Sequence, residues 1–183
     1  LLLNLMRQDL AQGHGFCLID PHGDLASQIA QDCQKHRPEE TLIWNAANPD
    51  CPYGYNPMTR VSGPFRPLIA SGLIDTLKKQ WADAWGARME HLLRYSILAL
   101  LEQPKADVRD ILKVFFDTAF RKAVVDQITD EQVRQFWQKE FPAMNYKNAA
   151  DGVAPIANKL GAFLAHPVIR KALCEPDQPL RFR

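Results

Sequence analysis

The 183-residue sequence lacks cysteine pairs, long apolar runs and any excess of one charge. Its four cysteines are far apart with no C-x-x-C pair, which excludes a zinc ribbon and a thioredoxin motif and favours reduced thiols of a cytosolic protein. The longest apolar stretch, around residues 97–101, is far shorter than the roughly 20 residues of a membrane span. With 22 basic and 21 acidic side chains, the chain is not a polybasic binder, so any nucleic-acid contact must come from a local patch.

The residues that are present indicate a folded chain with a substantial core. Hydrophobic residues make up 46% of the sequence, which is too many for a disordered chain. The sequence begins in mid-pattern at Leu1, without an initiator methionine, and stops at Leu180–Arg183 in a strand-like run. We therefore expect a piece of a longer protein.

The first 44 residues alternate between helical and strand patterns. Apolar residues recur at the helical period over residues 1–12, and Gly13 follows where a C-cap glycine belongs. Short apolar runs at 16–19 and 41–44 predict strands buried on both faces, with a helix over 25–35 between them. This order predicts an α/β fold in which the two strands pair in parallel through right-handed crossovers.

A long segment after the second strand is predicted to be all helical, from about Pro64 to Cys174. Turn signals fill residues 45–57, and a stripe of apolar residues four apart then predicts one long helix over 67–103, or two broken near Gly86. The stripe consists of Leu73, Leu77, Trp81, Trp85, Met89, Leu93, Ile97 and Leu101. We expect domain bounds of 1–63 for the α/β part, 64–175 for a helical insertion, and 176–183 for the start of the chain's return to the α/β part.

Helix-start signals divide the remainder of this block. Asp107 is predicted to cap a helix over 108–116, and Thr129 with Gln132 forms a capping box before 133–141. Asp151 is predicted to cap a helix that runs to about Ala165, and Pro167 begins a last short helix that reaches Cys174.

The turn after the first predicted strand concentrates the chemistry-bearing residues. It reads Asp20-Pro21-His22-Gly23-Asp24 and lies at the strand end where open α/β sheets place ligands. An aspartate there can hold a metal-bound water, and a second carboxylate four residues on can orient a water or a proton. The structural alternative is that Asp20 and Asp24 cap the next helix, and spacing alone does not separate the two.

Several segments together resemble a known family. They are Leu1–Leu5, Ile19–Leu25, Tyr55–Met58, Trp85–Met89, Leu92–Arg94, Phe136–Trp137 with Glu140–Phe141, and Pro155–Leu160. In these segments the chain resembles the P-loop ATPase core of the HerA/FtsK superfamily. It is most similar there to the TraG/TraD-like DNA-pumping ATPases of type IV secretion and conjugation.

This resemblance implies a partial P-loop NTPase-type parallel sheet with a large all-helical insertion, which would start just after the Walker A loop. It implies ATP and Mg²⁺ as cofactors in the complete protein, with Asp20 and Asp24 as catalytic residues and His22 and Gly23 near the nucleotide. Asp20 would meet the metal through water. It also implies DNA as a partner, a hexameric ring, contacts with a secretion channel or relaxase, and a cytoplasmic location at the inner face of the membrane.

Two departures qualify what the resemblance implies. No phosphate loop of the form G-x-x-x-x-G-K-[ST] occurs in the chain, so this piece alone is expected not to hydrolyse ATP. Asp24 stands where the family more often has Glu. Two other readings stay open: a non-catalytic helical binding module, and a metal-dependent phosphoesterase that uses Asp20, His22 and Asp24.

The remaining candidates are expected to have structural or solvent-exposed positions. Trp81 and Trp85 lie on the apolar stripe and are predicted to pack in the core rather than stack on bases. Lys159 is predicted on a helix surface, with a neighbouring subunit's nucleotide as the functional alternative. A solvated face, with DNA contact as the functional alternative, is also predicted for Arg88, Arg94, Arg121, Lys122, Arg134 and Lys139.

Overall fold

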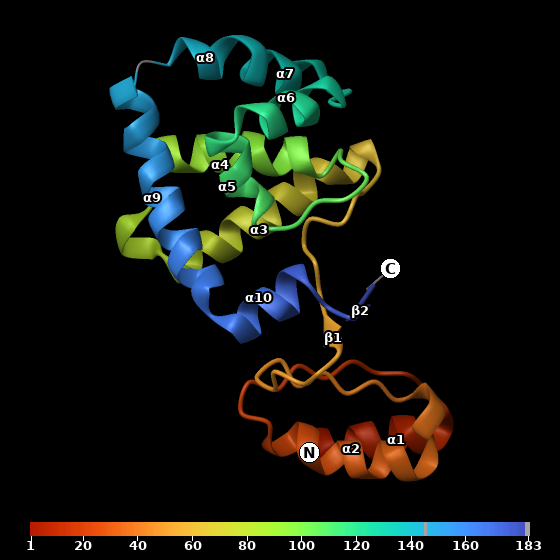
Figure 1. Ribbon diagram of the computed structural model, residues 1–183. Helices are drawn as coiled ribbons and strands as arrows, with labels where there is room; N and C mark the ends of the chain where they lie inside the picture. Colours follow the sequence, from red (N-terminus) through yellow and green to blue (C-terminus); the bar gives the residue numbers. More distant parts are fainter. Residues whose placement is uncertain (145, 182–183) are drawn as a thin grey trace. The chain divides into compact units, whose positions relative to one another are not determined.

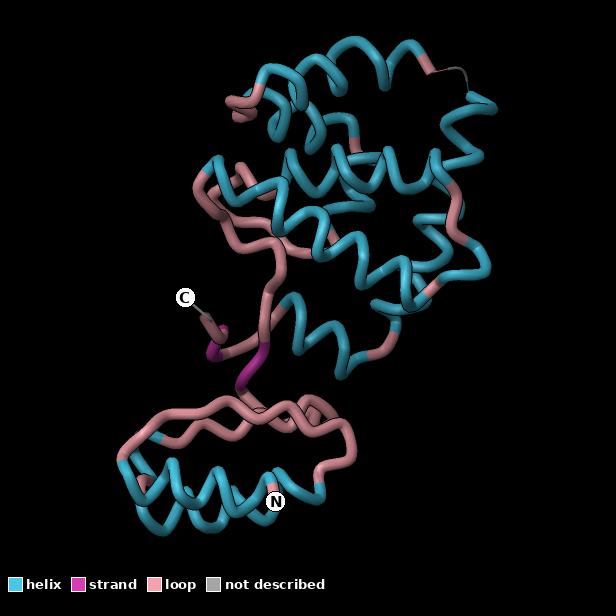
Figure 2. Tube along the Cα trace, turned by 180° about the vertical axis from the view of Figure 1, so that it is seen from behind, coloured by secondary structure: helices cyan, strands magenta, loops and turns pink. Residues whose placement is uncertain are grey.

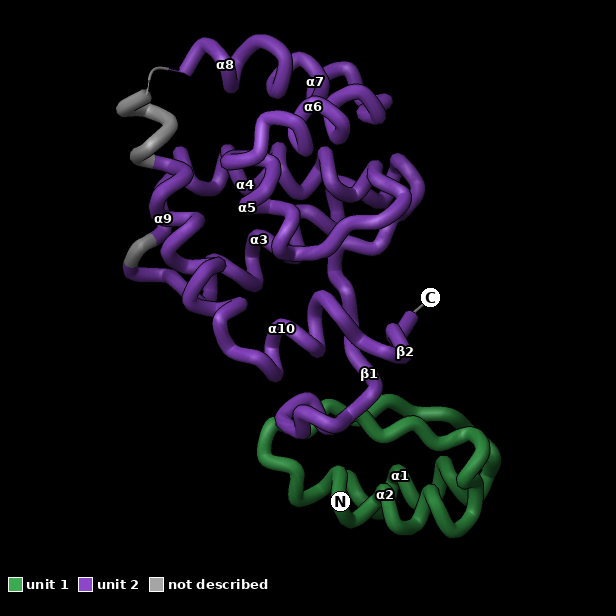
Figure 3. Tube along the Cα trace, viewed as in Figure 1, with its two compact units in different colours: residues 1–44 green, residues 45–183 purple. Residues whose placement is uncertain are grey.

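The computed structural model describes residues 1–144 and 146–181, and they form two compact units. Unit 1 comprises Leu1–Trp44 and unit 2 comprises Asn45–Arg183 (Figure 3). The contact boundary therefore follows residue 44, whereas the sequence pattern placed residues 45–63 with the first domain. The segment 45–63 packs with the helical unit.

Unit 1 consists of two helices and two extended segments. Helix α1 (Leu2–Gln12) ends at Gly13, whose φ of 83° is the left-handed conformation that favours glycine, as its position predicted. Helix α2 (Asp24–His36) and the 3₁₀ turn η1 (Pro38–Glu40) follow. The two helices bury a small core of Met6, Ile29 and Cys33, with Leu3, Leu10, Leu18 and Leu25 partly buried around it.

The structure corrects the prediction of two hydrogen-bonded strands in unit 1. Residues 14–20 and 41–46 run alongside each other in the same direction in both views (Figures 1 and 2), but neither is a strand, and no backbone hydrogen bond joins them among the described residues. Ile19 is 87% exposed and Leu42 50% exposed, so these apolar runs are not covered as strands buried on both faces would be. The sequence pattern identified the extended backbone, but burial and pairing need neighbours that unit 1 does not contain.

Unit 2 is a helical bundle, as the apolar stripe predicted. Helix α4 is its centre, because it packs against α3, α5, α6, α7 and α9 (Figure 1) and most of its residues from Leu92 to Leu100 are buried. The predicted long helix is broken near Gly86 into α3 and α4. The elements are η2 (Gly63–Phe65), α3 (Arg66–Gln80), η3 (Ala82–Ala84), α4 (Ala87–Leu100), α5 (Asp110–Phe116), α6 (Thr118–Asp126), α7 (Glu131–Gln135), η4 (Phe136–Glu140), α8 (Phe141–Ala143), α9 (Tyr146–Ala165) and α10 (Pro167–Cys174).

Two predicted helix starts are wrong. The cap of α7 is Asp130, whose side chain accepts a hydrogen bond from the Val133 N–H, whereas the Thr129 hydroxyl donates instead to the buried carboxylate of Glu102. Helix α9 begins at Tyr146, upstream of Asp151, whose side chain is outside the described part of the chain. A third predicted start is displaced, because α5 begins at Asp110 with Arg109 as its N-cap. Asp107 instead lies in the turn before α5, where its Oδ1 accepts from the Arg109 N–H at 2.8 Å while Asp110 Oδ2 accepts from the Asp107 N–H at 2.9 Å.

The segment η4 is a π-helical turn inside an otherwise continuous helix from α7 to α8. Pro142 follows one residue into α8 and has no N–H to donate to the preceding turn, which favours a local change in the hydrogen-bond pattern. The turn presents Phe136 and Trp137 to an aromatic cluster, in which the Phe136 ring stacks on Tyr95 with centroids 4.1 Å apart.

The strands of unit 2 form a two-stranded parallel sheet. Strand β1 (Tyr53–Gly54) pairs with β2 (Gln178–Pro179), and the Leu180 N–H donates to the Gly54 carbonyl at 2.7 Å. Gly54 also lies directly against α10, where an added Cβ would meet the Ala172 carbonyl oxygen at 2.3 Å. Only glycine fits this approach.

Candidate functional site

The carboxylate of Asp20 lies at the start of α2 and accepts hydrogen bonds from the backbone. Its Oδ2 accepts from the N–H groups of Leu25 at 2.9 Å and Ala26 at 3.0 Å, and its Oδ1 accepts from the His22 N–H at 3.1 Å. The turn that allows this contains Gly23, at φ 82° and ψ −10°. Asp20 therefore satisfies backbone donors that a helix start otherwise leaves without partners.

These hydrogen bonds also change the acidity of Asp20. The N–H of Ala26 has the largest effect in lowering the pKa of the carboxyl, which partial desolvation opposes and the His22, Gly23 and Leu25 backbone groups reinforce. The group is therefore an anion at neutral pH. Since Oδ1 accepts one of the three bonds, it keeps capacity for a water molecule.

The other predicted site residues flank this carboxylate. Asp24 is the first residue of α2 and is exposed, as is His22. An added Cβ at Gly23 would meet nothing within 4 Å, so the glycine serves the backbone conformation and leaves open space beside the turn. Among the described residues, no three His, Cys, Asp or Glu side chains are placed to hold a metal ion together.

The turn can act in two ways at once. The bonds to Leu25 and Ala26 are structural, and they fix the orientation of the Asp20 carboxylate at the end of the extended segment. A carboxylate held in one orientation, with Oδ1 engaged by a single backbone donor, can bind a water in a second coordination shell. The two interpretations that the sequence left open for Asp20, a helix cap and a functional carboxylate, are therefore compatible.

The candidates outside this turn only partly match their predicted positions. Arg94 and Arg121, which were predicted on a solvated face, are half-buried: Arg94 donates to Ser71 and Glu90, and Arg121 donates to the backbone carbonyls at the end of α5.

Trp81 and Trp85 pack against the core of unit 2, and the Trp85 indole donates to Glu90 Oε2 at 2.7 Å. The Lys159 ammonium lies 5.9 Å from the centre of the Trp81 ring, which is a cation–π contact on the bundle surface.

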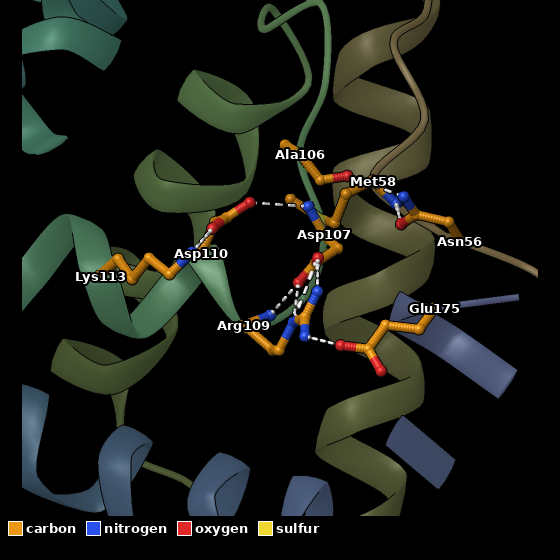
Figure 4. Close-up of polar contacts among 8 residues, drawn as sticks. All are labelled: Asn56, Met58, Ala106, Asp107, Arg109, Asp110, Lys113 and Glu175. Carbon is orange, nitrogen blue, oxygen red and sulfur yellow. Dashed lines mark hydrogen bonds and ion pairs between the residues drawn. The ribbon is translucent and has the colours of Figure 1, made fainter. Parts of the chain in front are cut away.

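A second polar cluster, shown in Figure 4, was not predicted from the sequence. The Asn56 amide donates to the Ala106 carbonyl at 2.7 Å, and its Oδ1 accepts from the Met58 N–H at 2.9 Å. Arg109 bridges Asp107, at 2.7 Å, and Glu175. The sequence segment Tyr55–Met58 drew attention to Asn56. The pairing of Asn56 with Ala106 and that of Arg109 with Glu175 have no local sequence signal.

Asp107 and Cys174 in this region have shifted acidities. Burial by itself raises the pKa of Asp107, but hydrogen bonds and charge from Arg109 outweigh it and lower the pKa overall. Burial raises the pKa of the Cys174 thiol to about 11, with a further contribution from the Asp107 charge. Cys174 is therefore a neutral, weakly reactive thiol at physiological pH.

Two further findings concern membrane-spanning helices and similarity to known proteins. No helix in the described part of the chain has both the length and the apolar character to cross a membrane. A comparison of the chain with protein-family models, curated proteins and solved structures found no significant match.

Proposed function

We propose that this chain is part of an ATP-driven motor that moves DNA, of the type used in conjugation and type IV secretion. In this proposal, unit 1 and the return strand belong to a P-loop ATPase core, and the helices of unit 2 are an insertion in it. The complete protein would bind ATP and Mg²⁺ and act on DNA as a hexameric ring.

The observation that carries the proposal is the oriented Asp20 carboxylate at the end of an extended segment. The segments 14–20 and 41–46 run in one direction, and α1 and α2 begin at the same end of unit 1 in both views (Figures 1 and 2). That arrangement supports a helix–extended–helix–extended order in which Asp20 and the start of α1 share one end. A phosphate loop that preceded α1 would lie at this end.

The residues of the turn fit the roles that this motor would need. Asp20 would hold a water bound to Mg²⁺ through Oδ1, because its Oδ2 is already engaged by two backbone donors. Asp24 is exposed beside it and would orient the attacking water. When bound, Mg²⁺ would neutralise charge on the ATP phosphates, and the two carboxylates would position water.

The test compares ATP turnover and thermal midpoint on the same samples of the complete protein. Asp20→Asn and Asp24→Asn should each lower turnover about tenfold or more, which corresponds to roughly 1.4 kcal/mol or more of lost transition-state stabilisation. Asp50→Asn is the matched control, because Asp50 is exposed in a turn and its carboxylate makes no contact within the described residues. DNA-stimulated turnover should fall with the basal rate.

Two outcomes would contradict the proposal. If Asp20→Asn lowers the thermal midpoint while its folded fraction keeps full turnover, Asp20 is a cap only. If the complete protein has no ATP turnover at all, the helical unit is better explained as a binding module.

The 183-residue chain alone should show no magnesium-dependent ATP hydrolysis. It contains neither the backbone cradle nor the lysine that would stabilise charge on the transferring phosphoryl group. Phosphate release from purified chain, measured beside the Asp20→Asn variant, checks this. Turnover that disappears in Asp20→Asn would show that the chain carries a different hydrolytic site.

A further inference from the structure

Unit 2 contains a surface cavity of about 290 Å³, partly open to solvent, that does not include the Asp20 turn. Its walls come from three segments that are distant in the sequence: the stretch after β1, the loop between α4 and α5, and the stretch from the end of α10 through β2. The lining residues are Asn56, Met58, Thr59, Arg60, Pro104, Lys105, Ala106, Cys174, Pro176, Pro179, Leu180 and Arg181.

Hydrogen bonds and an ion pair connect these three walls pairwise. The Asn56 amide holds the first wall to the second through the Ala106 carbonyl, at 2.7 Å (Figure 4). Arg109 holds the second to the third by bridging Asp107 and Glu175. The pairing of β1 with β2 holds the third to the first. The cavity is therefore preorganised, so a ligand would not have to order it.

The lining has a cationic part and an apolar part. Arg60, Lys105 and Arg181 contribute positive charge, and no aspartate or glutamate lines the cavity. Within the described residues, these three cations make no ion pair, whereas the neighbouring Asp107 and Glu175 are both taken by Arg109. The apolar part of the lining includes Pro104, Pro176, Pro179 and Leu180.

We propose that this cavity binds a phosphate ester, with the phosphate on Arg60, Lys105 and Arg181 and the organic part against the apolar wall. Guanidinium groups match the geometry of phosphate oxygens and form bidentate hydrogen bonds with them. A volume near the lower end of ligand sites, roughly 300 Å³, suits one small ester unit rather than a large cofactor.

Two sources can present this chemistry: a free mononucleotide, or one phosphodiester unit of a nucleic-acid strand. The cavity belongs to unit 2 and the Asp20 turn to unit 1, so this proposal does not rest on the proposed motor function. It is measured by binding to the chain as it is, without ATP turnover. The Asp20→Asn variant should bind as the unaltered chain does.

The experiment measures binding by the 183-residue chain to three probes: adenosine monophosphate, a short fluorescent single-stranded DNA, and inorganic phosphate. The double variant Arg60→Gln with Arg181→Gln should weaken binding about tenfold or more, since each removed group is a charged hydrogen-bond donor to phosphate. For the DNA probe, the slope of log affinity against log salt should fall by about 0.7 for each cation removed.

The matched control is Lys122→Gln with Lys139→Gln, which removes the same charge from exposed helix positions. It should leave binding within about twofold, because a residue outside the site contributes only a weak, screened charge effect. Arg60→Lys should restore only part of the affinity lost in Arg60→Gln, because it restores the charge but not the bidentate geometry of the guanidinium. Lys105→Gln tests the second wall independently if the double variant does not fold.

The probes also identify the source. Binding by adenosine monophosphate with none by DNA supports a small ester, and binding by DNA with a salt slope that the double variant reduces supports a nucleic-acid strand. Binding by inorganic phosphate alone, or by no probe, overturns the proposal. Equal weakening by the cavity variants and the control variant also overturns it, because binding would then reflect general surface charge.

Discussion

At the scale of single residues, Glu102 determines how the loop after α4 meets the starts of α3 and α7. Its side chain is only 2% exposed and pairs with Arg66 at 3.0 Å. It also accepts hydrogen bonds from the N–H groups of Thr129, at 2.7 Å, and Asp130, at 3.3 Å. A buried charge needs this full set of partners, so Thr129 is not available to cap α7.

Asp107 should make stability depend on pH in the acidic range. Its folded-state pKa lies below the ordinary 3.8, so its stabilising effect is present above that pH and is lost as the pH falls through the folded value. Asp107→Asn should therefore lower the thermal midpoint at neutral pH, and the difference from the unaltered chain should shrink below about pH 4.

Thermal unfolding at several pH values checks this prediction. Asp83→Asn is the control, because Asp83 is exposed and its carboxylate forms no ion pair or hydrogen bond among the described residues. A difference between Asp107→Asn and the unaltered chain that stays constant down to strongly acidic pH would show that the carboxylate charge has no part in stability.

At the scale of elements, β1 lies so close to α10 that an added Cβ at Gly54 would meet the Ala172 carbonyl oxygen at 2.3 Å. Gly54→Ala should destabilise the chain by about 1–3 kcal/mol, because the added methyl would overlap the Ala172 backbone, which cannot rotate away as a side chain can. Gly63→Ala is the matched control: its Cβ would meet nothing within 4 Å, and the change should stay within about 0.5 kcal/mol.

Urea unfolding of both glycine variants gives the comparison. The Gly54→Ala variant should also lose affinity for any ligand of the cavity, since β1 supports one of its walls. Equal stability of the two variants would mean that α10 moves away from β1 at little cost.

The elements also show what the sequence could predict. Helices α1, α2 and α10 were predicted within about two residues because Gly13 and Pro167 are local signals. The strand predictions at 16–19 and 41–44 were wrong, since a local sequence pattern does not determine whether an extended segment forms backbone hydrogen bonds with its neighbour. The cap at Asp117 of α6 was not predicted. The cavity could not be predicted either, because its walls come from segments around residues 56, 106 and 174 that meet only through the tertiary fold.

At the scale of the whole molecule, the two units have cores of very different size. Unit 1 buries Met6, Ile29 and Cys33, whereas unit 2 buries a much larger core with side chains from α3, α4, α5, α6, α7 and α9. A small core supports little stability, so the amides of α1 and α2 should exchange with solvent faster than those of α4. The amides of residues 15–20 and 42–44 should exchange fastest, because they donate to no backbone carbonyl in the described structure.

Hydrogen exchange on two core variants tests the independence of the units. Ile97→Ala, at a side chain with no exposure, should cost about 2–5 kcal/mol and lower protection in unit 2 while leaving α1 and α2 unchanged. Ile29→Ala, at 4% exposure, should do the reverse. If either variant lowers protection equally throughout the chain, the molecule unfolds as one cooperative body.

The pairing of Tyr53 with Gln178 has a kinetic consequence. It closes a loop that contains every helix of unit 2. The conformational entropy that this long loop loses on closure is offset only after the intervening chain is compact. We expect it to form last in refolding and to open first in unfolding. The cavity walls meet through this contact, so a bound ester would slow the first step of unfolding and leave the rate of helix formation unchanged.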